Sequence, residues 1–176
     1  MNEKILKIFT WIMLLIVAGI IFWFSHDSQA ETLSKSAILT DPLADRVLEG
    51  MEDQELTEYE VWSTRKRVIV FVRKTAHFLE FAAFGFFLCQ LLVLYKVKHP
   101  LVFATLGSML YAISDEIHQL LMKTREPRVT DVLVDTAGGL CGAAALLLLF
   151  WLIFKWKKKR DPLSNSSDSD DTGRNG

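Results

Sequence analysis

The sequence is poor in cysteine and proline, and it carries almost no excess charge. Its 176 residues include two cysteines and four prolines, and 20 basic residues are nearly balanced by 21 acidic ones. Both cysteines, Cys89 and Cys141, lie inside apolar segments, which excludes a disulfide framework in the exposed parts of the chain. Their spacing gives no zinc-site pattern, and the balanced charge gives no reason to expect a nucleic-acid partner.

Motifs of several common enzyme classes are missing as well. The chain has no serine-centred nucleophile motif and no glycine-rich loop of the kind that cradles phosphate groups. It also has no internal repeat. Catalysis by a serine nucleophile or by a phosphate-binding loop is therefore not supported.

Long hydrophobic runs are what the sequence has in abundance. Hydrophobic residues make up 51% of the chain and gather in four blocks. The first block is uncharged except for Lys7, and an α-helix of about 20 residues crosses the roughly 30 Å hydrocarbon core of a bilayer. It is too long for the apolar part of a signal peptide, so we expect it to be retained. The pattern predicts an all-α polytopic membrane protein, a single domain over residues 1–160, with four transmembrane helices at about 5–24, 74–95, 101–122 and 132–154.

One long polar segment, residues 25–73, separates the first two blocks, and a polar tail follows the last. Asp41-Pro42 marks a break in the long segment, and the stretch from Leu43 to Trp62 has the composition of a surface helix. The tail, residues 161–176, is almost free of apolar residues, so we expect it to be disordered.

Lysine and arginine residues near the helix ends predict the orientation in the membrane. The dense cluster KWKKKR, residues 155–160, favours a cytoplasmic C-terminus, and four helices then put the N-terminus on the same side. The loop 25–73 is then extracytoplasmic, although Arg65, Lys66 and Arg67 within it argue for the opposite orientation. We predict a multi-pass protein of the cell membrane with both termini in the cytoplasm.

Ionisable residues interrupt the last three blocks, each near one end. Because the helices alternate in direction, the start of the second, the end of the third and the start of the fourth meet at one membrane face. A charged side chain at the bilayer centre costs about 2.5 to 3.5 kcal/mol, so such residues face one another or a wet cavity. The spacing of Gly138 and Gly142 allows a close helix approach that would draw nearby aspartates inward. The pattern predicts a polar site formed by His77, Glu80, Asp115, Glu116, His118, Gln119, Asp131 and Asp135.

Three of these segments carry a resemblance to a known family. RKTAHFLEFAAFG (73–85), SDEIHQLL (114–121) and TREPRVTDVLVDTAGGLCG (124–142) resemble, in this order, the three signature regions of the VanZ-like membrane proteins. FSHDSQ, at the end of the first helix, is similar to theirs too. The family is bacterial and four-helical or similar in its core, and it includes a protein that raises tolerance to the glycopeptide teicoplanin. The resemblance implies a role in cell-envelope physiology.

By motif position, the resemblance also implies which residues bind a ligand. They are Lys74, His77, Glu80, Asp115, Glu116, Gln119, Arg125, Asp131 and Asp135, with Gly138 beside them. Two departures from the family's pattern stand out. Phe81 occupies a position where tyrosine is usual, which excludes a role for that hydroxyl. Lys123 and Thr124 stand where Pro-Gly is expected, so we expect an outer turn of different shape.

Three classes of function fit the pattern, and the first is a binding protein of the envelope. An outward-facing pocket would engage a lipid-linked cell-wall precursor, a lipid headgroup or a glycopeptide, with the lipid bilayer as the surrounding partner. Lys74 and Arg125 would hold phosphate or carboxylate groups, arginine through its bidentate fork. The acids would orient these basic side chains or bind amine and hydroxyl groups. We favour this class.

The second class is an intramembrane hydrolase, and the third is a carrier. In a hydrolase, a divalent metal such as zinc would activate water for attack on an ester or amide. Candidate metal ligands are His77, Glu80, Asp115, His118 and Asp135, and candidate catalytic residues are Glu80, Asp115 and Glu116. An ion- or proton-coupled carrier would need a homo-oligomer, since the charges gather at one membrane face.

The same residues also have purely structural interpretations. Asp115, Glu116 and the arginines of the outer turn could form an ion-pair network that fixes the helix register. His77 and Glu80 could be a hydrogen-bonded pair near the headgroups. Glu116 lies about 100° from Asp115 around the helix and could simply reach the interface. The sequence leaves these interpretations open beside the functional ones.

Overall fold

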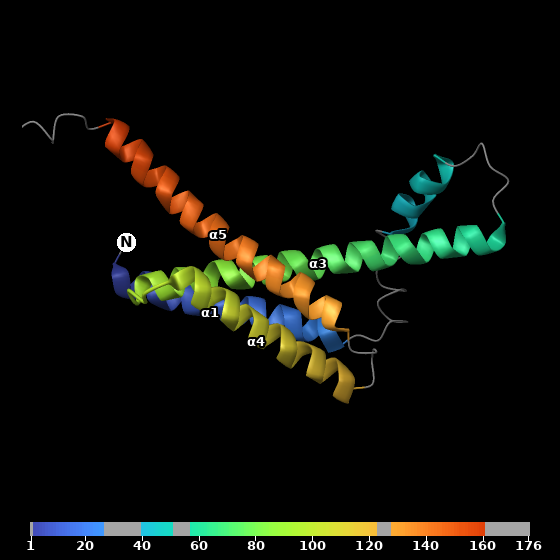
Figure 1. The fold of residues 1–176 in the computed structure, drawn as a ribbon, viewed down its shortest axis with the longest axis horizontal. Coiled ribbons are helices and arrows are strands. Elements are labelled where there is room, and N and C mark those ends of the chain that lie inside the picture. Colours follow the sequence, from blue (N-terminus) through green and yellow to red (C-terminus); the bar gives the residue numbers. More distant parts are fainter. Residues whose placement is uncertain (1, 27–39, 51–56, 123–127, 161–176) are drawn as a thin grey trace, which may run out of the picture.

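The protein is all-helical throughout the residues that the computed structural model describes, namely 2–26, 40–50, 57–122 and 128–160. The long helices and a short helix over residues 40–49 can be followed in Figure 1. The predicted all-α class is therefore confirmed. The long helices are α1 (Glu3–His26), α3 (Glu58–Leu94), α4 (Pro100–Leu121) and α5 (Val129–Arg160). The tail 161–176, expected to be disordered, lies outside the described residues.

The predicted start of the second long helix, at about residue 74, is wrong, because α3 begins at Glu58. A capping box fixes this start. The Thr57 hydroxyl accepts a hydrogen bond from the Glu60 backbone N–H at 3.4 Å, and the Glu60 carboxylate accepts one from the Thr57 N–H at 2.8 Å. Residues 58–73 contain neither glycine nor proline, so nothing stops the helix before the apolar block. Their charged side chains hid this continuity in the sequence.

The predicted surface helix from Leu43 to Trp62 is also corrected. A helix over residues 40–49 ends before α3 begins, and it lies alongside the first half of α3 (Figure 1). Arg65 of α3 holds it there, with nitrogens 2.6 Å from the Asp45 carboxylate and 3.5 Å from that of Asp41. The segment expected to be a loop therefore contains two packed helical pieces.

Among the residues that the structure describes, three helices are long and apolar enough to cross a membrane, and they cover Glu3–Ser25, Glu58–Leu94 and Val129–Arg160. The protein is thus a multi-pass membrane protein. Helix α4 does not belong to this set by composition, because polar residues fill its last turns. Helix α3, with 37 residues, is about 55 Å long, so its first turns extend beyond a hydrocarbon core of about 30 Å.

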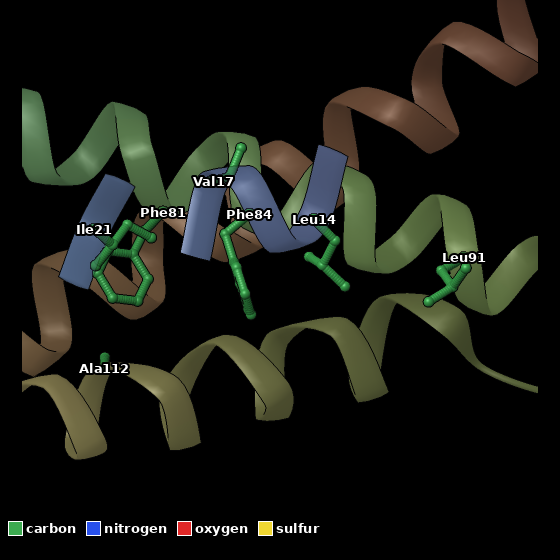
Figure 2. Close-up of a cluster of buried hydrophobic side chains, with 7 residues drawn as sticks. All are labelled: Leu14, Val17, Ile21, Phe81, Phe84, Leu91 and Ala112. Atoms are coloured by element: carbon green, nitrogen blue, oxygen red, sulfur yellow. The ribbon is translucent and has the colours of Figure 1, made fainter. Parts of the chain in front are cut away.

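The long helices form an antiparallel bundle whose core is apolar. At one end, the Lys7 ammonium near the start of α1 lies 4.8 Å from the ring centre of Tyr95, where α3 ends. Near the middle, the Tyr111 hydroxyl of α4 donates a 2.8 Å hydrogen bond to the Ala18 carbonyl of α1. Figure 2 shows the buried cluster that α1, α3 and α4 share, which consists of Leu14, Val17, Ile21, Phe81, Phe84, Leu91 and Ala112.

Helices α3 and α5 cross in backbone contact, and glycines make this possible. A methyl group added at Gly142 would overlap the backbone carbonyl of Ala82, and one at Gly138 would overlap that of Phe78. Small residues at helix interfaces in membranes allow such close approach. The expected role of this glycine pair in helix packing agrees with the structure, and the close crossing brings the start of α5 against the middle of α3.

Candidate functional site

A small polar cavity lies where α3, α4 and α5 meet at one end of the bundle. Its volume is about 20 Å³, enough for one water molecule. Among the described residues that line it, Val134 alone is apolar, and the rest carry charged or hydrogen-bonding groups. The lining consists of Arg73, Lys74 and His77 from α3, Glu116 and Gln119 from α4, and Asp131, Val134 and Asp135 from α5.

Three potential metal ligands from three different helices converge here, two of which, His77 and Asp135, line the cavity. Each offers one donor atom, and the three atoms lie within 4.8 Å of one another; the residues are His77, Asp115 and Asp135. Both carboxylates are buried, each residue being only 6% exposed. The three helix ends meet as their alternating direction predicts. The ligand that these side chains bind stays a prediction.

Asp115 is held in place by two hydrogen bonds to the same carboxylate oxygen. The Ser25 hydroxyl donates to its Oδ2 at 2.8 Å, and the Gln119 amide donates to the same atom at 2.9 Å. The Gln119 amide also lies 3.3 Å from the Ser25 hydroxyl, which completes a closed triangle. Since all three residues are buried, this network fixes the orientation of the Asp115 carboxylate.

Lys74 and Asp131 form an ion pair that joins α3 to α5. The Lys74 ammonium lies 2.6 Å from the Asp131 carboxylate, and both side chains are partly shielded from solvent. Lys74, expected to hold a ligand's phosphate, therefore already has a carboxylate partner inside the protein. Arg73 precedes it on α3 and also lines the cavity. Within the described part of the chain, Arg73 forms no ion pair.

Glu116 has a structural role as well as a place in the cavity wall. Its Oε1 atom accepts a hydrogen bond from the backbone N–H of Arg128, the residue before α5. This bond satisfies one of the backbone donors that a helix start leaves unpaired, and a negative charge there is favourable. Glu116 thus connects the end of α4 to the start of α5. The interpretation that its side chain only reaches the membrane interface does not account for this bond.

Two of the five candidate metal ligands do not belong to the converging group. The Glu80 carboxylate lies 3.7 Å from the Nδ1 atom of His77, which is too long for the hydrogen bond considered from the sequence. The His118 ring lies instead against Phe22 of α1, with ring centres 4.5 Å apart. Arg125, expected to contact the ligand, lies outside the described residues.

Sequence reasoning missed two residues of this site. Ser25, within the FSHDSQ segment, was not among the predicted site residues, but it is fully buried against Asp115. Arg73 was likewise not counted as a site residue, although it lines the cavity. The resemblance of both surrounding segments to the family signatures was the signal that pointed to them.

Phe81 fills a position that suits an apolar ring. It is fully buried, and its ring centre lies 6.0 Å from that of Tyr111 and 6.4 Å from that of Phe84. A tyrosine here would need a buried partner for its hydroxyl. The side chain belongs to the core beside the site and not to the cavity wall.

The arrangement combines buried acids with cations placed at one side of the same cavity. A histidine nitrogen and two carboxylates offer donors to a metal ion, an amine or a hydroxyl group. An arginine beside them offers a planar fork for phosphate or carboxylate. The site can therefore bind a polar group by charge and hydrogen bonding at the end of an otherwise apolar bundle.

Comparison with known families gives a match that covers most of the chain. The model of the VanZ/LLP1 family matches residues 9–157, which include most of α1, the cavity residues and most of α5. Comparisons with curated proteins and with solved structures give no match. Since the matched region holds all the helices that build the polar cavity, the chain belongs to the VanZ/LLP1 family.

Proposed function

We propose that this VanZ/LLP1-family membrane protein binds the phosphate-bearing headgroup of a lipid or lipid-linked envelope precursor against Arg73 at the rim of its polar cavity, whose interior of about 20 Å³ has room for a water molecule only. The observation that carries the proposal is the cavity itself, with Arg73 in its wall beside the ion pair of Lys74 and Asp131. A guanidinium at a cavity wall recognises phosphate through two parallel hydrogen bonds. The site residues lie on three helices, so the cavity has a defined shape.

The acidic side of the cavity would complete the recognition of such a headgroup. Asp131 and Asp135 line it from α5, and Gln119 lines it from α4. Carboxylates accept hydrogen bonds from the hydroxyl and amine groups that headgroups carry next to their phosphate. A ligand with both kinds of group would bind better than inorganic phosphate alone.

The proposed topology places this cavity in the outer leaflet. Four spans, with α4 as the least apolar one, put the starts of α1 and α4 and the ends of α3 and α5 at the cytoplasmic side. The basic residues after Phe154 favour that orientation. Helix α4 would be shielded from lipid at its polar end by its contacts with α1, α3 and α5. A reporter fused after Arg160 tests this topology, and an extracytoplasmic C-terminus would overturn it.

Binding is tested with the purified full chain in nanodiscs of phosphatidylcholine, to which phosphatidylglycerol or a short-chain polyprenyl phosphate is added. We expect saturable binding of the phosphate-bearing probes, weakened at least tenfold by Arg73→Gln. Arg67→Gln is the matched control, because Arg67 lies on the same helix but not in the cavity wall. Equal binding by both variants would contradict the proposal.

A role in glycopeptide tolerance is the physiological part of the proposal. It is supported by the family membership and by the buried position of Asp115 at the centre of the site. A susceptible Gram-positive host that makes the protein should tolerate more teicoplanin than one with an empty vector. Asp115→Asn, at matched membrane level, should remove that gain. An unchanged inhibitory concentration with the wild-type protein would separate headgroup binding from antibiotic tolerance.

A metal-dependent hydrolase is the second candidate function. It is favoured by the convergence of His77, Asp115 and Asp135, with Glu80 close to His77. Such a protein would release a water-soluble headgroup from the lipid probes above. Product release that depends on Asp135 would favour hydrolysis, whereas binding without turnover would favour recognition alone.

A further inference from the structure

We propose that His77, Asp115 and Asp135 hold one divalent transition-metal ion, with zinc as the best match to the donors. This metal centre goes beyond the proposed headgroup binding and does not depend on it, and it is the centre that the second candidate function would require. One nitrogen and two carboxylate oxygens are a common set of zinc ligands, and three protein ligands leave a fourth position for water or substrate.

The donor atoms lie close to the separations that a single ion requires. Bonds of about 2.0 to 2.2 Å place the donors of a tetrahedral zinc ion about 3.3 to 3.6 Å apart. The donors of His77, Asp115 and Asp135 all lie within 4.8 Å of one another. Binding of the ion would draw these side chains inward from their present separation.

Asp135 gives an independent reason to expect a cation here. It is 6% exposed and lines the cavity, yet it makes no hydrogen bond or ion pair with the residues that the structure describes. A buried carboxylate without a partner is costly in a membrane protein, and a second buried carboxylate nearby raises the cost. A divalent ion between Asp135 and Asp115 would remove this repulsion.

The surroundings are built like the outer shell of a metal site. Ser25 and Gln119 both donate to Oδ2 of Asp115, which fixes the direction of that carboxylate. The Glu80 carboxylate lies 3.7 Å from Nδ1 of His77, beyond hydrogen-bonding distance, and would orient the imidazole of a metal-bound histidine only after moving closer to it. Hydrogen bonds from such outer groups commonly hold metal ligands in position. The cavity of about 20 Å³ leaves room for a water molecule at the open coordination position.

The test measures metal in the full chain, purified in detergent with an affinity tag that does not bind metals. Elemental analysis after incubation with zinc and removal of excess should give about one zinc per wild-type chain. We expect Asp135→Asn to lower this content at least tenfold. Asp131→Asn is the matched control, since Asp131 lies one turn away on α5 and pairs with Lys74 outside the converging group, and it should retain the metal.

Thermal unfolding provides a second readout that is independent of the elemental analysis. Zinc should raise the melting temperature of the wild type and of Asp131→Asn, and leave that of Asp135→Asn unchanged. Replacement by Co²⁺ should give visible absorption bands that disappear in His77→Ala. No bound metal and no thermal shift in the wild type would overturn the metal centre. Equal metal content in Asp135→Asn and wild type would also overturn the metal centre. Neither of these two results would bear on headgroup binding, which is measured separately with phosphate-bearing lipids.

Discussion

The two ends of the helix bundle are held together by different kinds of interaction. At the site end, Ser25, Gln119 and Asp115 form directional hydrogen bonds between α1 and α4. At the other end, a cluster of buried apolar residues packs α3, α4 and α5 together, and it consists of Cys89, Ala104, Ala143 and Leu146. Both ends are well buried, so burial alone does not distinguish them.

This difference teaches where a membrane protein has reason to keep polar side chains. In lipid, helices associate through van der Waals packing of apolar side chains, and small residues let their backbones approach closely, so no charged group is needed. The apolar end shows that this bundle can be assembled in that way. The charged side chains at the site end also make contacts between helices, but ionisable groups are a costly way to pack a bundle in lipid, which supports a functional reason for their presence.

The largest expected effect comes from breaking the helix crossing on which both ends depend. Gly142→Leu would force α5 away from the Ala82 carbonyl, so we expect a loss of about 3 kcal/mol or more and little folded protein. Gly19→Leu is the control, because a side chain there meets open space on α1. Size-exclusion profiles and thermal unfolding in detergent measure the difference. Comparable stability of both variants would mean that the crossing is looser than described.

The next substitution is expected to lower the stability of the bundle without changing binding at the polar cavity. Leu146→Ala removes a side chain that is 1% exposed at the apolar end, and we expect a loss of about 2 to 3 kcal/mol. Binding at the polar cavity should remain as in the wild type, because the cavity lining is unchanged. Leu148→Ala, on the same helix but 55% exposed, should change stability by less than about 0.5 kcal/mol. A loss of binding in Leu146→Ala would show that the two ends are coupled.

A smaller effect tests the ion pair at the rim of the site. The partly exposed pair of Lys74 and Asp131 should contribute roughly 1 kcal/mol, and salt should weaken it. A double-mutant cycle with Lys74→Met and Asp131→Asn, followed by thermal unfolding at low and high salt, isolates this contribution. Strictly additive single effects would mean that the pair does not stabilise the crossing of α3 and α5.

The smallest effect concerns the hydrogen bond that ties α1 to the site. Ser25→Ala removes the hydroxyl that donates to Asp115, and buried hydrogen bonds in membrane proteins contribute about 0.6 kcal/mol on average. We expect a loss near 1 kcal/mol, because the buried Asp115 oxygen then has one donor fewer. The matched control is Ser114→Ala, whose exposed hydroxyl bonds within its own helix. Indistinguishable melting temperatures for the two variants would remove Ser25 from the network.

Several features of the fold followed from the sequence with little ambiguity. Apolar blocks of about 20 residues predicted membrane helices because a bilayer has a fixed thickness, and three of them meet that description in the structure. The glycine pair Gly138 and Gly142 predicted a close helix crossing. The alternating direction of consecutive helices depends only on how they are connected. It therefore predicted that the polar residues of three helices meet at one end of the bundle.

Other features were beyond what the sequence could give. The start of α3 at Glu58 was missed, because charged residues in a helix that leaves the membrane look like those of a loop. The burial of Ser25 was missed for a related reason, since a serine at a helix end is usually solvated. His118 was grouped with the candidate metal ligands, but its ring faces Phe22 of α1 instead.

The sequence by itself determined the helical class, the membrane environment, the family and the end of the bundle at which polar residues gather. These depend on composition, on order along the chain and on the fixed rise of a helix. Only the tertiary structure decided which donors meet, because the rotation of each helix about its axis is set by packing, here by the contact of Gly142 with Ala82 and of Gly138 with Phe78. That rotation turns His77, Asp115 and Asp135 toward one another and leaves His118 against α1.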